Sequence, residues 1–405
     1  MRRIAILLLL AMSASAGERE RAAHVLDRLA FGARPGEVDR VTQLGVDRWI
    51  ELQLHPERGD DAKSDARVAQ YAREVIPDLS AQRILRAAES ERQLNEVMLD
   101  FWMNHFNVFA GKRLDRYLIA DYERETIRPR MWGSFEELLL ATAKSPAMLV
   151  YLDNARSRGG ALNENYAREL MELHTLGVDG GYTQKDVTEL ARVLTGWSIT
   201  RPDDGDIRFV FRRGVHDGGT KQVLGVTIQG GGMEEGERMI RFLARHPSTA
   251  RFLATKLCQR LVADEPPPAL VARVALRFTA TNGDLRETVR AIVTSREFHD
   301  PRYYDAKMKS PFEYAISAIR AAGGTIVNPL PLARELRKLG EPLYFAQPPT
   351  GYADDAETWG NSGALVARVE FALALSTNKL RGIRIVTSDA DALAKQLGAP
   401  EFQRQ

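Results

Sequence analysis

The chain has 405 residues, with 56 Lys and Arg against 54 Asp and Glu, and 44% of its residues are hydrophobic. This near balance of charge excludes a strongly basic nucleic-acid-binding protein, and the apolar fraction excludes a largely disordered chain. The single cysteine, Cys258, excludes a small module held together by disulfides. At roughly 150 residues per domain, the length fits one large core or two to three smaller ones.

The N-terminus has the pattern of a secretory signal peptide. Arg2 and Arg3 precede the apolar run 4–12, and the small residues Ala-Ser-Ala follow at 14–16. The apolar run is far shorter than the roughly 20 residues that cross a bilayer. We therefore predict that residues 1–16 are removed on export and that the remaining chain is periplasmic or extracellular, without a membrane span. An uncleaved anchor or an ordinary first helix is the alternative.

Apolar residues recur with the helical period through most of the chain, which predicts a mainly α fold. Thr183 and Asp186 resemble a capping box at the start of one of the helices. The region 341–363 contains several Pro and Gly residues and is predicted to be a loop. The predicted helices are 18–31, a helix between Pro35 and Gly45, 46–54, 80–112, 113–128, 134–144, 162–176, 184–195, 234–245, 248–263, 267–280, 284–297, 308–322 and 330–339.

One segment alternates with period two. Residues 207–212 and 222–228 predict two strands of a β-hairpin, with 216–221 at its tip. We therefore expect a large helical body with a small hairpin insertion near 207–228. Residues 17–405 are predicted to form a single domain, and 198–235 is the expected seam if the chain divides.

Several motifs together carry a family resemblance. They are HVLDRLAFG at 24–32, DFWMNHF at 100–106, NENYARELMELHTLG at 163–177, LTGW at 194–197 and HDGGTK at 216–221. With these motifs the chain resembles the bacterial family called "domain of unknown function 1800", over about residues 22–375. The resemblance implies an exported protein, often encoded beside a second family that resembles sulfatases and alkaline phosphatases. That neighbour is the partner it suggests, and the resemblance implies no particular reaction.

One position departs from the family pattern. Members usually carry a Pro-Pro turn followed by Gly-Trp and by a second Trp. Here Pro348-Pro349 is followed by Gly351-Tyr352 and by Trp359. An aromatic ring is therefore retained, but a role specific to an indole is in doubt.

The helix predicted at 162–176 carries the first candidate site. At about 100° per residue, Asn165, Arg168, Glu169 and Glu172 lie within one arc of about 100°, and Glu164 precedes them. Glu169 and Glu172 could share a metal ion or act as acid and base. The alternative is a solvated helix face with an Arg168–Glu172 ion pair.

Two histidines and an asparagine are further candidates. His174 lies in the last turn of that predicted helix, where a catalytic role and a capping role are both open. His105 shares an apolar helix face with aromatic residues, so a buried structural histidine is the stronger interpretation and a catalytic one the alternative. Asn104 lies on another face of the same helix and is a candidate for lining a polar surface.

The glycine-rich segment 214–221 is the third candidate site. His216, Asp217 and Lys221 come together there, which suits contact with an anion or a metal ion. The segment is not a P-loop, because Thr220 precedes Lys221 and no strand-to-helix transition is predicted. The alternative is a solvated hairpin tip in which Asp-Gly supplies the turn.

Two hypotheses for function follow. The first is an exported enzyme, a hydrolase that uses Glu169, Glu172, Arg168, His105 and His174, with a divalent metal held by Glu169, Glu172, His216 and Asp217. The second is a non-catalytic periplasmic binding or assembly protein that partners the sulfatase-like neighbour. Zinc-helix, di-iron, serine-hydrolase and dinucleotide-binding motifs do not occur in the sequence.

Overall fold

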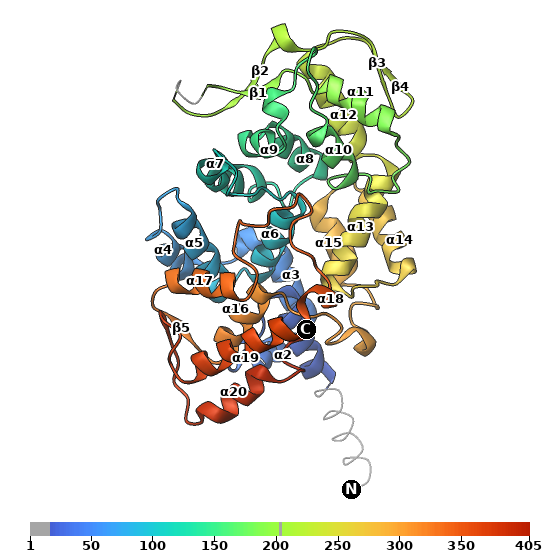
Figure 1. Cartoon of the computed structure of the whole chain (residues 1–405). Helices are drawn as coiled ribbons and strands as arrows, with labels where there is room; N and C mark the ends of the chain where they lie inside the picture. The colour runs from blue at the N-terminus through green and yellow to red at the C-terminus, as the bar shows by residue number, and fades with distance from the viewer. Residues whose placement is uncertain (1–16, 202–204) are drawn as a thin grey trace.

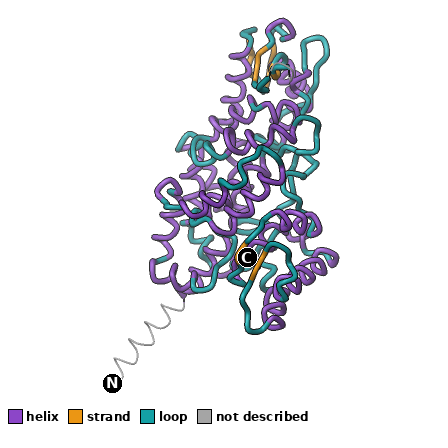
Figure 2. Tube along the Cα trace, turned by 90° about the vertical axis from the view of Figure 1, so that its left-hand side faces the viewer, coloured by secondary structure: helices purple, strands orange, loops and turns teal. Residues whose placement is uncertain are grey.

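The computed structural model describes residues 17–201 and 205–405 (Figure 1). The predicted signal peptide, 1–16, lies outside the described residues. Nearly all regular structure is helical, with short strands in small two-stranded sheets (Figure 2), which confirms the mainly α fold. Within the described residues, no helix is long and apolar enough to cross a bilayer.

The first three helices follow the predicted ranges closely, whereas the short helix at 62–68 was not predicted. Residues 17–29 are helical, and Gly32 follows with φ of 78°, a conformation that glycine adopts without strain. Gly45 likewise separates the next two helices with a positive φ. These elements are α2 (Glu37–Leu44), α3 (Val46–Leu54), α4 (Ala62–Val68), α5 (Ile76–Glu89) and α6 (Gln93–His105).

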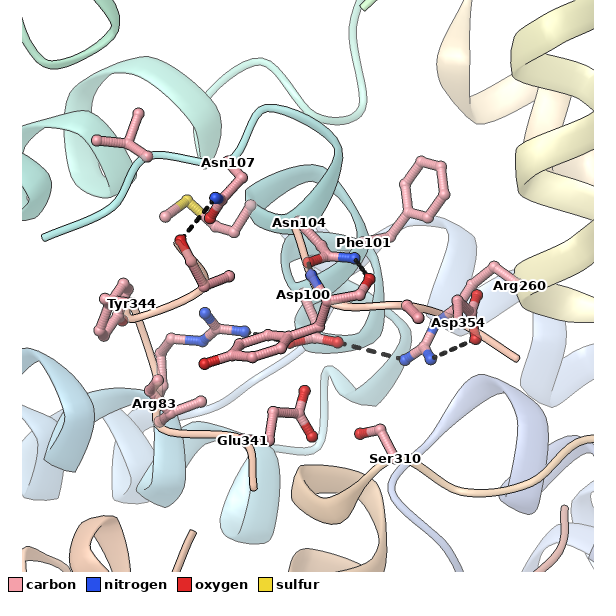
Figure 3. Close-up of a pocket in the computed structure, with 16 residues that line it drawn as sticks. Arg83, Asp100, Phe101, Asn104, Asn107, Arg260, Ser310, Glu341, Tyr344 and Asp354 are labelled. Carbon is pink, nitrogen blue, oxygen red and sulfur yellow. Dashed lines mark hydrogen bonds and ion pairs between the residues drawn. The ribbon is translucent and has the colours of Figure 1, made fainter. Parts of the chain in front are cut away.

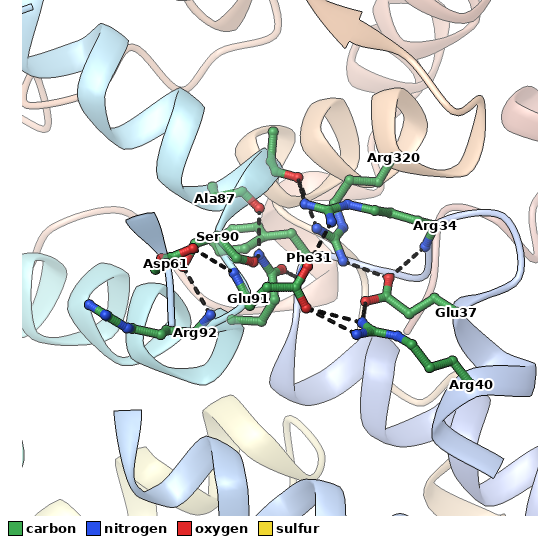
Figure 4. Close-up of polar contacts among 12 residues, drawn as sticks. Phe31, Arg34, Glu37, Arg40, Asp61, Ala87, Ser90, Glu91, Arg92 and Arg320 are labelled. Carbon is green, nitrogen blue, oxygen red and sulfur yellow. Dashed lines mark hydrogen bonds and ion pairs between the residues drawn. The ribbon is translucent and has the colours of Figure 1, made fainter. Parts of the chain in front are cut away.

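The single long helix predicted at 80–112 is wrong, because the chain breaks between α5 and α6 (Figure 4). Ser90 leaves the helical conformation with ψ of 141°, and its hydroxyl contacts the Asp61 carboxylate. The side chain of Glu91, the next residue, accepts hydrogen bonds from Arg34 and Arg40. Ala, Leu and Glu favour helix throughout this stretch, so local propensity gave no sign of a break made by tertiary contacts.

The middle of the chain forms the upper part of the molecule in Figure 1. The capping box at Thr183 and Asp186 is confirmed at the start of α11. The helix predicted at 162–176 is shorter than expected, because α10 ends at Glu172. The helices of this part are α7 (Asp115–Asp121), which continues as a π-helical turn over Tyr122–Ile127, then α8 (Phe135–Lys144), α9 (Pro146–Tyr151), α10 (Asn165–Glu172) and α11 (Gln184–Val193).

The segment 207–228 contains β-strands, as predicted, but these strands pair differently from the predicted hairpin. β2 (Phe209–Phe211) pairs with β1 (Trp197–Ile199), which precedes it, and β3 (Lys221–Val223) pairs with β4 (Val226–Ile228). The turn between β3 and β4 is Leu224-Gly225, both with positive φ, as a tight two-residue hairpin requires. Residues 216–220 therefore connect two hairpins, and Lys221 begins β3, so the segment is not the tip of a hairpin.

The C-terminal part returns to helices along one side of the molecule and then to its lower part (Figure 1). The helices α19 and α20 and the short β5–β6 pair were not predicted. The elements are α12 (Met233–Ala244), α13 (Pro247–Leu261), α14 (Pro268–Ala280), α15 (Leu285–Val293), α16 (Pro311–Ala321), β5 (Thr325–Ile326), α17 (Leu330–Lys338), α18 (Ala356–Trp359), α19 (Ser362–Ser376), β6 (Ile383–Arg384) and α20 (Ala390–Gly398).

The helix α6 lies at the centre of this arrangement. Its buried Trp102 stacks on Phe106, the residue that follows the helix, and Phe106 stacks in turn on Phe135 of α8. The loop that follows α17, residues 341–355, runs along α6 before the chain enters α18 (Figure 1). We call this segment the strap. It lies within the predicted loop 341–363, and it positions the site described next.

Candidate active site

Two asparagines near the end of α6 hold the strap. The Asn104 amide donates to the Tyr352 carbonyl oxygen at 2.8 Å, and the Tyr352 amide donates to Asn104 Oδ1 at 2.7 Å. Asn107 Nδ2 donates to the carbonyl oxygens of Ala346 at 2.9 Å and Pro348 at 2.8 Å. A side-chain amide offers both a donor and an acceptor, so it pairs with backbone as another backbone would. The asparagines of the DFWMNHFN segment therefore anchor the strap.

Gly351 is required at the point of closest approach. Its φ is 72°, and a Cβ there would lie 2.3 Å from Asn104 Oδ1. Tyr352, at the position where the family usually has Trp, donates its hydroxyl to the Pro342 carbonyl oxygen at 2.8 Å. Its ring lies 6.3 Å from the ring of Trp359. The phenol therefore binds the two ends of the strap together.

The strap divides a cleft into two compartments, which together we call the central cleft. The inner pocket, of about 60 Å³, lies between α5, α6 and the strap. The outer chamber, of about 370 Å³, lies between α6, α13 and the strap. Both compartments are lined by Phe101, Asn104, Tyr352, Ala353 and Asp354.

The inner pocket contains closely packed charges (Figure 3). Asp100 of α6 is paired with Arg83 of α5 and lies 3.4 Å from Arg260 of α13. Arg260 also lies 2.6 Å from Glu313. Glu341, at the start of the strap, accepts a hydrogen bond from the Phe312 amide at 2.7 Å and has no ion pair within the described residues.

Glu341 and Asp100 differ in their electrostatic surroundings. Burial, together with the negative charge of Asp100, raises the pKa of Glu341 to about 8. Burial also raises the pKa of Asp100, but the guanidinium groups of Arg83 and Arg260 oppose that shift. The cations favour the charged form of Asp100, whereas the proton remains on Glu341 at neutral pH. Glu341 thus keeps its proton at neutral pH beside an aspartate that is paired with two guanidinium groups.

The walls of the outer chamber carry three carboxylates, those of Asp264, Asp354 and Asp355, and one ammonium group, that of Lys256. Lys307 Nζ lies 2.6 Å from Asp264 and 2.9 Å from Asp354. Asp355 caps α18 by accepting from the Thr358 amide at 2.8 Å. Lys256 of α13 lines the chamber and has neither an ion pair nor a hydrogen bond in the part of the chain that the structure describes. Burial lowers its pKa.

The structure places His105 in the wall of the outer chamber and His174 behind it. His105 Nε2 lies 3.2 Å from the His174 carbonyl oxygen, so Nε2 carries the proton and donates it. Burial lowers the pKa of His105 well below its usual value and that of His174 to about 3. His174 follows the end of α10 instead of lying in its last turn. Both histidines are neutral at physiological pH.

The carboxylates predicted on α10 lie outside the two compartments of the central cleft. Glu169 and Glu172 are half-buried, and burial together with the charge of Glu172 raises the pKa of Glu169. Arg168 pairs with Glu164 at 3.1 Å instead of Glu172. Asn165 is exposed at the first position of α10, and its backbone N–H donates to Asn163 Oδ1.

The segment 216–221 is tied to its surroundings by its own charges. Lys221 Nζ lies 2.7 Å from the carboxylate of Glu235, which also contacts His216 Nε2. Asp217 lies 2.8 Å from Arg192. The Lys221 and Glu235 side chains are 0% exposed, so this network is enclosed. Within 17–201 and 205–405, no group of three or more His, Cys, Asp or Glu is placed to hold a metal ion, including Glu169, Glu172, His216 and Asp217.

Sequence reasoning missed the residues that give the central cleft its chemistry. Arg83, Lys256 and Arg260 lie in helices far from the strap in sequence, where nothing distinguishes them from surface charges. Glu341 and Asp354 had a usable signal, since both border a long Pro- and Gly-rich loop, and loops of this kind often carry function. Of the predicted residues, Asn104 and His105 line the outer chamber.

The fold and the site define a mainly helical protein whose central cleft is divided by a loop and contains a buried glutamate beside an ion-paired aspartate. The family model described as "Protein of unknown function (DUF1800)" matches residues 24–405, and the chain belongs to this family. No curated protein and no solved structure matches the chain.

Proposed function

We propose that the protein is an exported hydrolase whose active site is the central cleft. The observation that carries this proposal is the buried carboxyl group of Glu341, whose raised pKa keeps it protonated beside the ion-paired Asp100 in the inner pocket. A buried carboxyl group whose pKa is raised toward neutrality is a recurring arrangement for acid–base catalysis at neutral pH. The signal-peptide pattern of residues 1–16 supports export to the periplasm or the cell exterior.

Glu341 is the general acid in this proposal. Its pKa of about 8 keeps a transferable proton on the carboxyl group at neutral pH. The substrate occupies the outer chamber, and its bond to be cleaved lies where the two compartments meet. Glu341 gives its proton to the leaving-group oxygen as that bond breaks, so the leaving group departs as an alcohol.

Asp354 is the general base, because its carboxylate lines both compartments. It accepts a proton from the attacking water, and the resulting hydroxide forms the new bond to the substrate. The inner pocket, at about 60 Å³, is large enough to hold the attacking water. Lys307, 2.9 Å from Asp354, holds that carboxylate in place. Glu169 and Glu172 have no role in this mechanism.

The test is a screen of the purified exported protein with chromogenic esters, glycosides and phosphate esters. With the substrate class that is turned over, Glu341→Gln should reduce kcat by about 10²–10⁴-fold, the usual contribution of a general acid. Glu172→Gln is the matched control, since it changes a half-buried glutamate outside the cleft, and should leave kcat unchanged. Wild-type activity in Glu341→Gln, or no turnover of any of the three classes, contradicts the proposal.

A further inference from the structure

The outer chamber has the size and the walls of a small-molecule site. Its volume of about 370 Å³ lies within the range of about 300–1,000 Å³ typical of ligand pockets. The aromatic side chains Phe101 and Tyr352 line it, and they also line the inner pocket. A ligand in the chamber therefore contacts aromatic surface beside the proposed catalytic groups.

Three of the polar side chains that line the chamber, Asp264, Asp354 and Asp355, are carboxylates, which accept hydrogen bonds and do not donate them when ionised. Asp264 and Asp354 are held by Lys307, and each carboxylate has further lone pairs for a ligand. The chamber thus suits a ligand with several hydroxyl donors.

Lys256 is the one cation among these lining groups, and the described residues provide no ion pair for it. Lys307, which holds two of the carboxylates from behind the wall, has two partners of its own. A partly buried ammonium without a counter-ion favours a ligand that brings one negative charge. A phosphate dianion fits less well, because the three carboxylates of the chamber repel the second charge.

From these three observations we infer that the outer chamber binds a sugar acid, a hydroxylated ring with one carboxylate. The carboxylate pairs with Lys256, and the ring hydroxyls donate to the aspartates. The apolar face of the ring packs on the aromatic side chains. This inference rests on the proposed function, because it names the substrate class of that hydrolase.

Binding of glucuronate, glucose and glucose 6-phosphate to the full exported protein, measured by calorimetry, tests the inference. We expect glucuronate to bind at least tenfold more tightly than either of the other two. We also expect its Kd to rise with NaCl concentration while that of glucose stays constant. Equal binding of glucuronate and glucose, or tighter binding of glucose 6-phosphate, overturns the inference.

Two lysine variants make the test specific. Lys256→Gln should weaken glucuronate binding at least tenfold and leave glucose binding unchanged. Lys379→Gln, which alters an exposed lysine elsewhere, is the control and should bind as wild type does. Lys256→Arg keeps the charge and should retain the preference for glucuronate over glucose. Unchanged glucuronate binding in Lys256→Gln contradicts the inference, and the salt dependence decides the matter if that variant does not fold.

The variant Glu341→Gln separates this inference from the proposed function. Its glucuronate binding should equal that of wild type, because Glu341 lines the inner pocket and not the outer chamber. If wild type binds glucuronate but hydrolyses no ester, glycoside or phosphate ester, the hydrolase proposal fails and the sugar-acid site stands. If a substrate is hydrolysed but glucuronate does not bind, the sugar-acid inference fails alone.

Discussion

The segment 216–221 and the central cleft both bury charged side chains, but they differ in whether those charges have partners. In the first, Lys221 and His216 converge on Glu235, and Asp217 meets Arg192. In the cleft, the described contacts leave Glu341 without a cation and Lys256 without an anion. Paired charges hold a loop in place, whereas charges left without a partner are available to a ligand. The density of charged residues in the sequence does not distinguish the two cases.

The largest expected effect is the loss of a buried ion pair. Lys221→Met should reduce the free energy of unfolding by about 3–5 kcal/mol, because it leaves the buried Glu235 carboxylate without its cation. Lys256→Met makes the same chemical change at a lysine without an ion pair and should cost about 1 kcal/mol or less. Urea denaturation of both variants measures the contrast. Similar losses in the two would show that Lys256 has a structural partner as well.

A smaller effect is expected from crowding the strap. Gly351→Ala places a methyl group against Asn104 and should destabilise the protein by about 2–4 kcal/mol, from steric overlap and from the positive φ. Gly340→Ala is the matched control. Gly340 also has a positive φ, of 99°, but the nearest atom to its Cβ would be on Trp359 at 3.9 Å. Thermal denaturation should show a loss of about 1–2 kcal/mol there, and equal losses would mean that the strap moves away readily.

The third expected effect concerns pH. The pKa of Glu341 is about 8 in the folded state against a usual value of 4.5, so the folded protein holds a proton that the unfolded chain releases. Stability therefore falls as pH rises from about 4.5 to about 8, by an amount on the order of a few kcal/mol. Glu341→Gln should remove this part of the pH dependence. Denaturation at pH 5 and pH 9 measures it, and parallel losses in wild type and variant would contradict the assignment.

The smallest effect is expected on α10. Arg168→Gln removes an ion pair with Glu164 in which the arginine side chain is 40% exposed, and should cost about 0.5 kcal/mol or less. The same urea measurements detect it. A loss of more than about 2 kcal/mol, or a loss of activity, would restore the polar face of α10 as a functional surface.

Much of the fold could be predicted from the sequence because helix boundaries are local. Gly45 ends α2, Thr183 with Asp186 begins α11, and the apolar period marks most helices between them. The break at Ser90 was missed because it depends on Asp61, Arg34 and Arg40, which belong to other elements. The strand pairing was missed because β1, at 197–199, follows directly after a helix and has no alternating pattern of its own.

The candidate site was only partly predictable for a related reason. Asn104 and His105 were singled out and do line the outer chamber, but Glu341 and Lys256 acquire their properties from burial. Whether a charge is paired depends on contacts between residues far apart in the chain. His216 and Lys221 looked equally reactive in the sequence, and only the position of Glu235 shows that they are paired with protein.

The contacts between Asn104 and Tyr352 also bear on the order in which the protein folds. They join residues 248 positions apart, and the contact of Arg260 with Asp100 spans 160 positions. Closing such long stretches of chain costs entropy that local helices do not incur, so these contacts form late. A ribosome-bound chain that ends before residue 341 has α6 but cannot enclose the cleft. The compartments therefore come into existence only when residues 341–355 have joined the rest of the chain.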